Sequence, residues 1–113
     1  MILRSKKFLA ANKIVAFIKG NYNNPRCGYS NAVVQILQVH GAEDAVFVNI
    51  LENHELMAKM KIYSDWLTYP QLYINGTLIG GYDIVLELHQ SGEIIKILSE
   101  AGIKSKMSEH FKK

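Results

Sequence analysis

The chain has 113 residues, of which 49% are hydrophobic and one is a cysteine, and its formal net charge is +3. This length favours a single domain, and the hydrophobic content is enough for a buried core. A lone cysteine excludes a secreted scaffold held by internal disulfides and favours a reducing compartment, and no apolar run approaches the roughly 18 residues of a membrane span.

Positive charge is concentrated in the first part of the chain. Residues 1–42 hold six Lys or Arg and no acid, whereas the remainder holds seven bases and ten acids. No tight cluster of Lys and Arg is interleaved with aromatic residues, which disfavours a nucleic-acid surface. An anionic small partner fits this charge distribution better.

The chain begins with a pattern typical of a helix, then a strand, a loop and a second helix. Residues 3–12 have helical composition and predict a short amphipathic helix. Its expected buried residues are Leu3, Phe8 and Leu9, and its expected solvated residues are Arg4, Lys6 and Lys7. The apolar run at 14–18 predicts a strand, and a loop rich in Gly, Asn and Pro leads into a helix that begins just after Cys27. Gly41 ends that helix, and we interpret His40 as its cap rather than as a metal ligand.

The run at 45–50 is apolar on both faces, which predicts a central parallel strand and completes a βαβ unit with residues 14–18. Asn53 is the expected N-cap of a helix over 54–62, where His54 is solvated. The pair Asn75-Gly76 predicts a hairpin between strands at 71–74 and 78–79.

A helix from Asp83 to His89 breaks at Ser91-Gly92, and a last amphipathic helix reaches Gly102. Residues 1–103 are interpreted as one domain, and the polar, basic residues 104–113 as a disordered tail. The element order predicts a thioredoxin-like three-layer α/β sandwich with a four-stranded mixed sheet. A right-handed crossover then places Cys27 at the edge of the sheet where such folds bind ligands.

Cys27 is the first candidate for chemistry, because the predicted helix begins beside it. The unpaired N–H groups and the dipole of a helix N-terminus favour an anion, and Lys19 and Arg26 add positive charge, so a thiolate is expected. The alternative is a buried structural cysteine. A Cys between Arg26 and Gly28 in a polar loop is poorly placed for a core.

Three blocks of sequence resemble the monothiol glutaredoxins, in the order that the family has them. Residues 27–30 read C-G-Y-S, similar to the family's C-G-F-S with Tyr29 in place of Phe. Residues 66–76 resemble its W-P-T-x-P-Q-hydrophobic-Y-x-N-G block, and residues 80–83 its G-G-x-D turn. Lys19 stands eight residues before the cysteine, as in the family. Residues 31–41 are closest to the single-domain mitochondrial type, and a glutaredoxin domain at 1–103 is implied.

Two functions remain for this site, because Ser30 stands where dithiol enzymes have their second cysteine. Cys27 exchanges with glutathione-capped thiols by a monothiol route, or it ligates metal. A [2Fe-2S] cluster needs four thiolates and one chain supplies one. Two chains with two glutathiones would supply four, which is the arrangement that the resemblance implies. The Ser30 hydroxyl either pairs with the sulfur or the backbone, or caps the helix.

We therefore expect a monothiol glutaredoxin that binds a glutathione-ligated [2Fe-2S] cluster between two subunits and carries it to acceptor proteins. The alternative is a glutathione-dependent thiol-disulfide oxidoreductase that deglutathionylates proteins, with weak activity at most. An adaptor with a vestigial site is the third reading. The expected partners are glutathione, a second copy, and iron-sulfur donor and acceptor proteins, without nucleic acid or membrane. The expected location is the mitochondrial matrix or another reducing compartment, such as an organelle stroma or the cytoplasm.

The resemblance also implies roles for individual residues. Lys19 would bind a glutathione carboxylate, and Tyr82 and Asp83 the γ-glutamyl end. Pro70 matches the family's cis-proline, which leaves the backbone of the preceding residue, Tyr69, free to pair with the tripeptide. An ordinary trans turn proline is the alternative. Trp66 is expected to pack beside the groove.

Three residues depart from the family pattern. Met57 replaces an Arg that grips a glutathione carboxylate, Leu67 replaces a Pro, and Tyr82 replaces a common Cys. Lys61, one helical turn beyond Met57, is expected to replace the arginine in part, whereas Lys59 points about 200° away from Met57. The predicted site comprises Cys27 as catalytic residue and metal ligand, with cofactor-binding residues Lys19, Tyr29, Lys61, Thr68, Tyr69, Pro70, Gly81, Tyr82 and Asp83.

Overall fold

The computed structural model describes residues 2–21, 23–25, 27–42, 44–66 and 68–108. Arg26, Leu67 and residues 109–113, which entered the expectations above, lie outside the described residues. Within the described part of the chain, no helix has the length and apolar character to cross a membrane.

Helices and strands follow one another in the predicted order, with two short additions. The helices are α1 (Ile2–Ala11), α2 (Gly28–Val39), α3 (His54–Ser64), α4 (Tyr82–Ser91) and α5 (Glu93–Glu100). The main strands are β1 (Ile14–Ile18), β4 (Val46–Asn49), β5 (Gln71–Ile74) and β6 (Thr77–Gly80). The additions are the β2 (Gly20–Asn21) and β3 (Asn24–Pro25) pair in the loop before Cys27, and a 3-10 turn, η1 (Ile50–Glu52).

The main sheet has the strand order β4-β1-β5-β6, with β1 parallel to β4 and antiparallel to β5. The predicted mixed sheet and the hairpin at Asn75-Gly76 are confirmed, and both turn residues have positive φ angles of 54° and 80°. The prediction that residues 45–50 form a central strand is wrong, because β4 lies at the edge. Its residues are apolar on both faces because Phe47 and Val48 pack into the two opposite cores.

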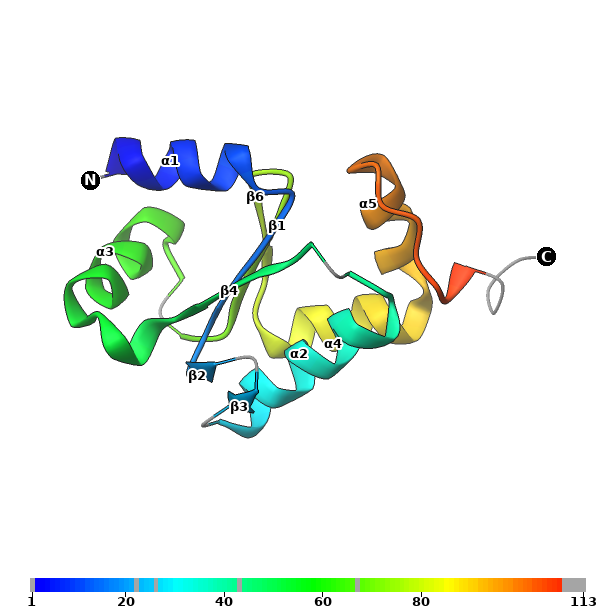
Figure 1. Ribbon diagram of the computed structural model, residues 1–113, viewed down its shortest axis with the longest axis horizontal. Coiled ribbons are helices and arrows are strands. Elements are labelled where there is room, and N and C mark those ends of the chain that lie inside the picture. Colours follow the sequence, from blue (N-terminus) through cyan, green and yellow to red (C-terminus); the bar gives the residue numbers. More distant parts are fainter. Residues whose placement is uncertain (1, 22, 26, 43, 67, 109–113) are drawn as a thin grey trace.

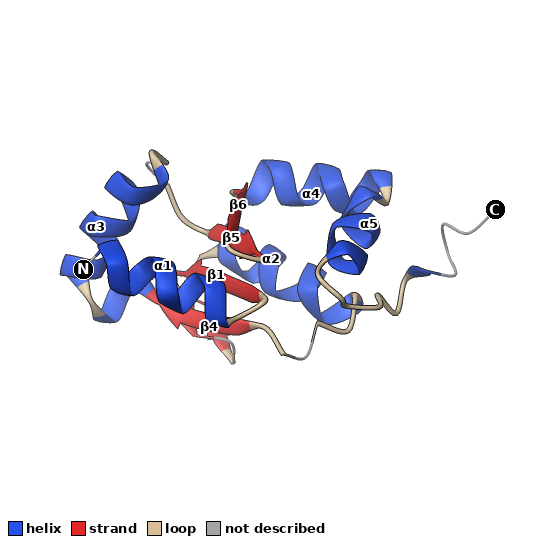
Figure 2. Cartoon of the chain, turned by 90° about the horizontal axis from the view of Figure 1, so that it is seen from above, coloured by secondary structure: helices blue, strands red, loops and turns tan. Residues whose placement is uncertain are grey.

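Side chains of β1 divide the interior into two layers. Ile14, Ala16 and Ile18 pack with residues of α2, α4 and α5, whereas Val15 and Phe17 pack on the other face with Leu9 of α1 and Met60 of α3. Figures 1 and 2 show these two groups of helices on opposite sides of the sheet. The predicted three-layer α/β sandwich is confirmed. Phe8 was expected in the buried face of α1 and is 38% exposed.

The C-terminal end of α2 is tied to α4 and to the segment after α5 by a buried histidine. His40 is the C-cap residue of α2, as predicted, but its ring is fully buried. Its Nδ1 lies 2.6 Å from Ser105 Oγ and its Nε2 lies 2.8 Å from His89 Nδ1. The Lys106 N–H donates to the His40 carbonyl at 3.0 Å. Ser105 and the backbone of Lys106, which belong to the tail expected from residue 104, therefore contact the domain through His40.

The buried His40 ring makes stability depend on pH. Burial, together with the charge of His89, lowers the pKa of His40 from 6.5 to about 4. Because this folded-state pKa lies below the unfolded value, the neutral ring stabilises the fold above pH 6.5, and the stabilisation is lost as the pH falls through 4. We expect this residue to remove about 1–3 kcal/mol from the free energy of unfolding across that range.

Urea unfolding at a series of pH values measures this effect. His40→Gln should have a lower free energy of unfolding than the wild type at neutral pH, and this difference should shrink as the pH falls. His54→Gln is the matched control, because His54 is exposed on α3. A gap between wild type and His40→Gln that stays constant with pH would contradict the assignment.

Candidate functional site

A cavity of about 650 Å³ lies where the N-terminal ends of α2 and α4 meet α3 and the loop before β5. Its lining includes all ten residues that the sequence analysis selected: Lys19, Cys27, Tyr29, Lys61, Thr68, Tyr69, Pro70, Gly81, Tyr82 and Asp83. Met57, Trp66 and Ile84 complete it. Ile84 was not anticipated, because an apolar residue in the first turn of a helix is indistinguishable in sequence from a core residue. The structure thus brings five segments of the chain together at one cavity: the residue after β1, the N-terminal ends of α2 and α4, α3, and the loop before β5.

Cys27 is the N-cap residue of α2 and is partly exposed. Its backbone is extended, with φ −145° and ψ 134°, and its carbonyl accepts the N–H of Asn31 at 2.9 Å. The sulfur therefore stands beside N–H groups that have no partner in the helix itself. A buried structural cysteine, the alternative considered from the sequence, is not what the structure shows.

The surroundings of Cys27 favour its thiolate. Partial burial raises the pKa of Cys27, but the N–H groups of Ser30 and Tyr29, the Ser30 hydroxyl and the charge of Lys19 together lower it below its ordinary value. Ser30 is fully buried, and its Oγ also accepts the backbone N–H of Lys19 at 3.0 Å. The Ser30 hydroxyl thus interacts with both the sulfur and the backbone N–H of Lys19, which agrees with the first of the two roles considered from the sequence, the other being helix capping.

The loop before β5 forms one wall of the cavity. The Tyr69-Pro70 peptide bond is cis, as predicted. The Tyr69 hydroxyl donates to the Met57 carbonyl at 2.6 Å, and burial, with a contribution from Tyr73, raises the pKa of Tyr69 to about 12. The phenol therefore stays protonated and joins this wall to α3. The buried Gln71 amide donates to the carbonyls of Trp66 and Thr68 at 3.0 and 3.2 Å, which fixes the loop between them.

The N-terminus of α4 forms a second wall beside this loop. Gly81 is its N-cap residue and Asp83 lies exposed in its first turn. A Cβ atom at Gly81 would stand 3.2 Å from Trp66 Nε1 and 3.3 Å from the Pro70 carbonyl oxygen, so this position admits little more than glycine. The indole of Trp66 packs against this turn, and its Nε1 is buried without a hydrogen-bond partner among the described residues.

Two tyrosines meet across the two helix N-termini. The rings of Tyr29 on α2 and Tyr82 on α4 have centroids 4.9 Å apart and planes tilted by 40°. Tyr29 remains 60% exposed. Ring pairs at this distance contribute about 0.5–1.5 kcal/mol beyond the area they bury. The pair therefore joins the helix that carries Cys27 to the helix that carries Asp83.

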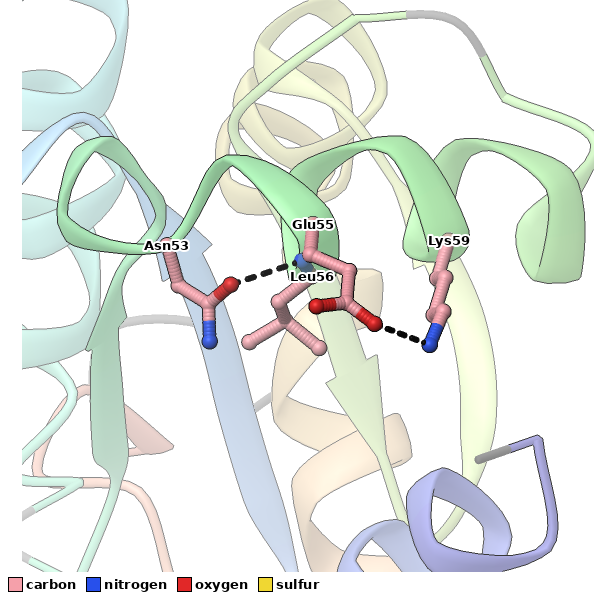
Figure 3. Close-up of polar contacts among 4 residues, drawn as sticks. All are labelled: Asn53, Glu55, Leu56 and Lys59. Atoms are coloured by element: carbon pink, nitrogen blue, oxygen red, sulfur yellow. Dashed lines mark hydrogen bonds and ion pairs between the residues drawn. The ribbon is translucent and has the colours of Figure 1, made fainter.

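The third wall is α3, whose two lysines have different surroundings. Lys61 lines the cavity beside Met57, and its Nζ lies 5.9 Å from the centre of the Tyr69 ring. Lys59 instead pairs with Glu55 at 2.6 Å on the exposed side, as Figure 3 shows together with the capping bond from Leu56 N–H to Asn53. Neither Lys19 nor Lys61 forms an ion pair within the part of the chain that the structure describes.

Cys27 is also the single thiol that the 113 residues offer to a metal. Among the described residues, no three His, Cys, Asp or Glu side chains gather in a way that could hold a metal ion. The site consequently presents one stabilised thiolate beside a cavity lined by a helix N-terminus and by two lysines that form no ion pair with any described residue.

Comparison with known proteins gives one consistent family. A family model described as Glutaredoxin matches residues 14–79. The protein named probable monothiol glutaredoxin 2 of Rickettsia conorii is 52% identical over 87 residues, covering 77% of this chain and 80% of the relative. Glutaredoxin-related protein 5, mitochondrial, of Danio rerio is 41% identical over 100 residues, covering 88% of this chain. The chain spans 64% of the length of that relative. The solution structure of reduced poplar apo GrxS14 matches with a TM-score of 0.77 and 43% identity, covering 88% of this chain and 90% of that one.

The Ser30 hydroxyl gives a direct test of how the thiolate is stabilised. Ser30→Ala removes a donor to the sulfur and the acceptor for the Lys19 N–H, so the pKa of Cys27 should rise. The rate of alkylation by iodoacetamide, followed across pH, should then reach its midpoint at higher pH and be several-fold slower at neutral pH. Ser99→Ala, at an exposed position, is the control. An unchanged pH profile in Ser30→Ala would show that the hydroxyl does not act on the sulfur.

Proposed function

Because the chain belongs to the glutaredoxin family and is a monothiol member of it, we propose that it binds glutathione and carries [2Fe-2S] clusters to acceptor proteins. The observation that carries this proposal is the single, partly exposed Cys27, whose surroundings favour the thiolate at the rim of a cavity. A thiolate is the form of cysteine that ligates iron.

The number of thiolates makes the carrier a dimer. A [2Fe-2S] cluster needs four ligands of this kind, and each chain supplies Cys27 alone. One glutathione held in the cavity beside Cys27 adds a second thiolate, and a second copy of the chain with its own glutathione completes the set. The cluster is cargo in this proposal. This chain holds and orients two of its ligands and releases them to an acceptor.

The cavity walls suit a tripeptide with two carboxylates. Lys19 and Lys61 provide the two cations on the rim, and the N-terminal N–H groups of α4 at Tyr82 and Asp83 suit the γ-glutamyl carboxylate. Thr68, Tyr69 and Pro70 present the edge of the loop before β5, along which an extended peptide can pair. Gly81 leaves room for the Trp66 indole and the Pro70 carbonyl, so this loop can lie close to the N-terminus of α4.

Thiol-disulfide exchange is the second function that the site supports, because a stabilised thiolate is also a nucleophile. Cys27 would attack the glutathione sulfur of a mixed disulfide, forming a Cys27-glutathione disulfide and releasing the protein thiolate. A free glutathione thiolate would then attack that disulfide, producing oxidised glutathione and regenerating the Cys27 thiolate. The chain has no second cysteine to speed this step, so turnover should be weak.

The proposal also covers location and partners. We place the protein in the mitochondrial matrix or another reducing compartment, such as an organelle stroma or the cytoplasm. The relative from Danio rerio is named as mitochondrial, which supports the first of these. A lone, unpaired cysteine supports reducing conditions in general. The partners are iron-sulfur donor and acceptor proteins, glutathione and a second copy of the chain.

Anaerobic reconstitution with iron, sulfide and glutathione tests the carrier function. We expect sulfide-to-iron charge-transfer bands, about one cluster for two chains, and glutathione about equal in number to the chains. The holo protein should elute as a dimer in size-exclusion chromatography, and Cys27→Ser should bind no cluster. A cluster held by a monomer, or bound equally well without any added thiol, would contradict the proposal. Disulfide turnover comparable to that of a dithiol glutaredoxin would favour the second function.

The two lysines of α3 test how the carboxylates are held. Lys61→Ala should weaken the binding free energy of glutathione by about 1 kcal/mol or somewhat more, because a hydrogen bond to a charged group is lost. The lifetime of the cluster should shorten correspondingly. Met57→Arg should strengthen binding, since a guanidinium pairs with a carboxylate through two bonds. Lys59→Ala is the matched control, because Lys59 pairs with Glu55 away from the cavity.

Cluster loss measured against glutathione concentration and salt separates these variants. The effect of Lys61 should diminish at high salt, since a point charge near solvent is screened. If Lys59→Ala is the damaging change, the assignment of Lys61 to the glutathione carboxylate is wrong.

A further inference from the structure

Asn49, the last residue of β4, makes more hydrogen bonds with its side chain than strand residues usually do. Its Oδ1 accepts the backbone N–H of Gly20 at 3.0 Å and that of Leu51 at 3.0 Å. Its Nδ2 donates to Glu52 Oε1 at 3.0 Å. Because the oxygen faces two donors and the nitrogen faces a carboxylate, the amide is satisfied in this orientation alone. The bond to Leu51 caps η1, whereas the bond to Gly20 crosses to a different part of the chain.

The bond to Gly20 fixes the backbone directly after Lys19. Ile18 and Asn49 are opposite each other where β1 and β4 run in parallel, and β1 ends at Ile18. The next N–H, that of Lys19, donates to Ser30 Oγ, and the one after it, that of Gly20, donates to Asn49. Two successive amides are therefore held from two elements, α2 and β4. Lys19 lies between these two anchors.

Gly20 makes this anchor necessary. It is buried, and its φ of 97° lies in the left-handed region where the chain turns out of the sheet. A buried N–H group that loses its acceptor is costly, so the turn would rearrange if Asn49 could not reach it. A rearranged turn at Gly20 moves the Cα of Lys19, and with it the direction in which the lysine side chain extends.

We propose that Asn49 is a positioning residue for the site: through the Gly20 amide it holds Lys19 where its ammonium group faces the Cys27 sulfur and the cavity. Asn49 does not line the cavity, and it acts through Lys19. The coulombic effect of Lys19 on Cys27 is part of what favours the thiolate. The effect on Cys27 is independent of any ligand, whereas a matching effect on glutathione affinity rests on the proposed function.

The substitution Asn49→Ser separates capping from positioning. Serine is a good cap, so its hydroxyl can still accept the Leu51 N–H, but it is one bond shorter and cannot span to Gly20. Asn53→Ser is the matched control. Asn53 caps α3 through the N–H of Leu56 at 2.9 Å and, among the described residues, makes no hydrogen bond to the loop that carries Lys19. Circular dichroism and thermal unfolding confirm that each variant is folded.

The readout is the alkylation of Cys27 by anionic iodoacetate relative to neutral iodoacetamide, in the full chain without iron or glutathione. A cation beside the sulfur favours the anionic reagent, so this ratio reports the place of the Lys19 charge. We expect Asn49→Ser to lower the ratio by about threefold at low salt and to slow both reactions at neutral pH, with little change in Asn53→Ser. Lys19→Met should lower the ratio at least as much.

A double-mutant cycle decides whether Asn49 acts through Lys19. In the Lys19→Met background, Asn49→Ser should leave the ratio unchanged. The proposal is overturned if Asn49→Ser changes the ratio equally in both backgrounds, if Asn53→Ser has the same effect, or if Asn49→Ser has none. Should Asn49→Ser fail to fold, Asn49→Thr replaces it, because threonine also offers a hydroxyl cap and suits a strand, and the same outcomes then decide. Because neither reagent requires glutathione or iron, these outcomes are independent of whether the protein carries clusters.

Discussion

The hydrogen bond from the Lys19 N–H to the buried Ser30 Oγ is the contact on which the site depends. It joins the end of the central strand to the first turn of α2, and so brings the lysine ammonium and the Cys27 sulfur into one electrostatic environment. The same hydroxyl donates to the sulfur, so the strand end, the helix and the thiolate share one polar group. A thiolate near the surface needs such donors, because partial burial alone would favour the thiol.

The walls of the cavity beside the thiolate are fixed by hydrogen bonds from buried side chains and by an aromatic contact. The Tyr69 hydroxyl connects the loop before β5 to the Met57 carbonyl of α3, and Gln71 fixes the same loop from within the sheet. Tyr29 and Tyr82 connect the N-termini of α2 and α4. Each wall is therefore tied to a neighbouring wall. A preformed cavity loses little conformational freedom when it binds a peptide, which suits a ligand as flexible as glutathione.

The helices α2 and α4 are held together at both of their ends. The tyrosine pair joins them at the site, and His40 and His89 join them at the opposite end, where Ser105 also binds His40. These two helices carry Cys27 and Asp83, so their relative position decides the distance between the thiolate and the N-terminus of α4. The segment after α5 thus contributes to the site indirectly, by closing the distant end of the helix pair.

Local patterns in the sequence determined the elements and the members of the site. Each of these patterns involves residues that are close in sequence, so it can be recognised without knowing the fold. They are the strand and helix periodicities, the Asn53 cap and the Asn75-Gly76 turn. The site residues came from the resemblance of three blocks to the monothiol glutaredoxins, with Lys61 added from helical spacing, and the structure places them at one cavity. Tertiary structure alone decided the edge position of β4, the burial of His40 and the role of Asn49. The hydrogen bonds of Asn49 and His40 span separations of 29, 49 and 65 positions along the chain. A contact between such distant residues leaves no local signature, because either partner alone resembles an ordinary strand or cap residue.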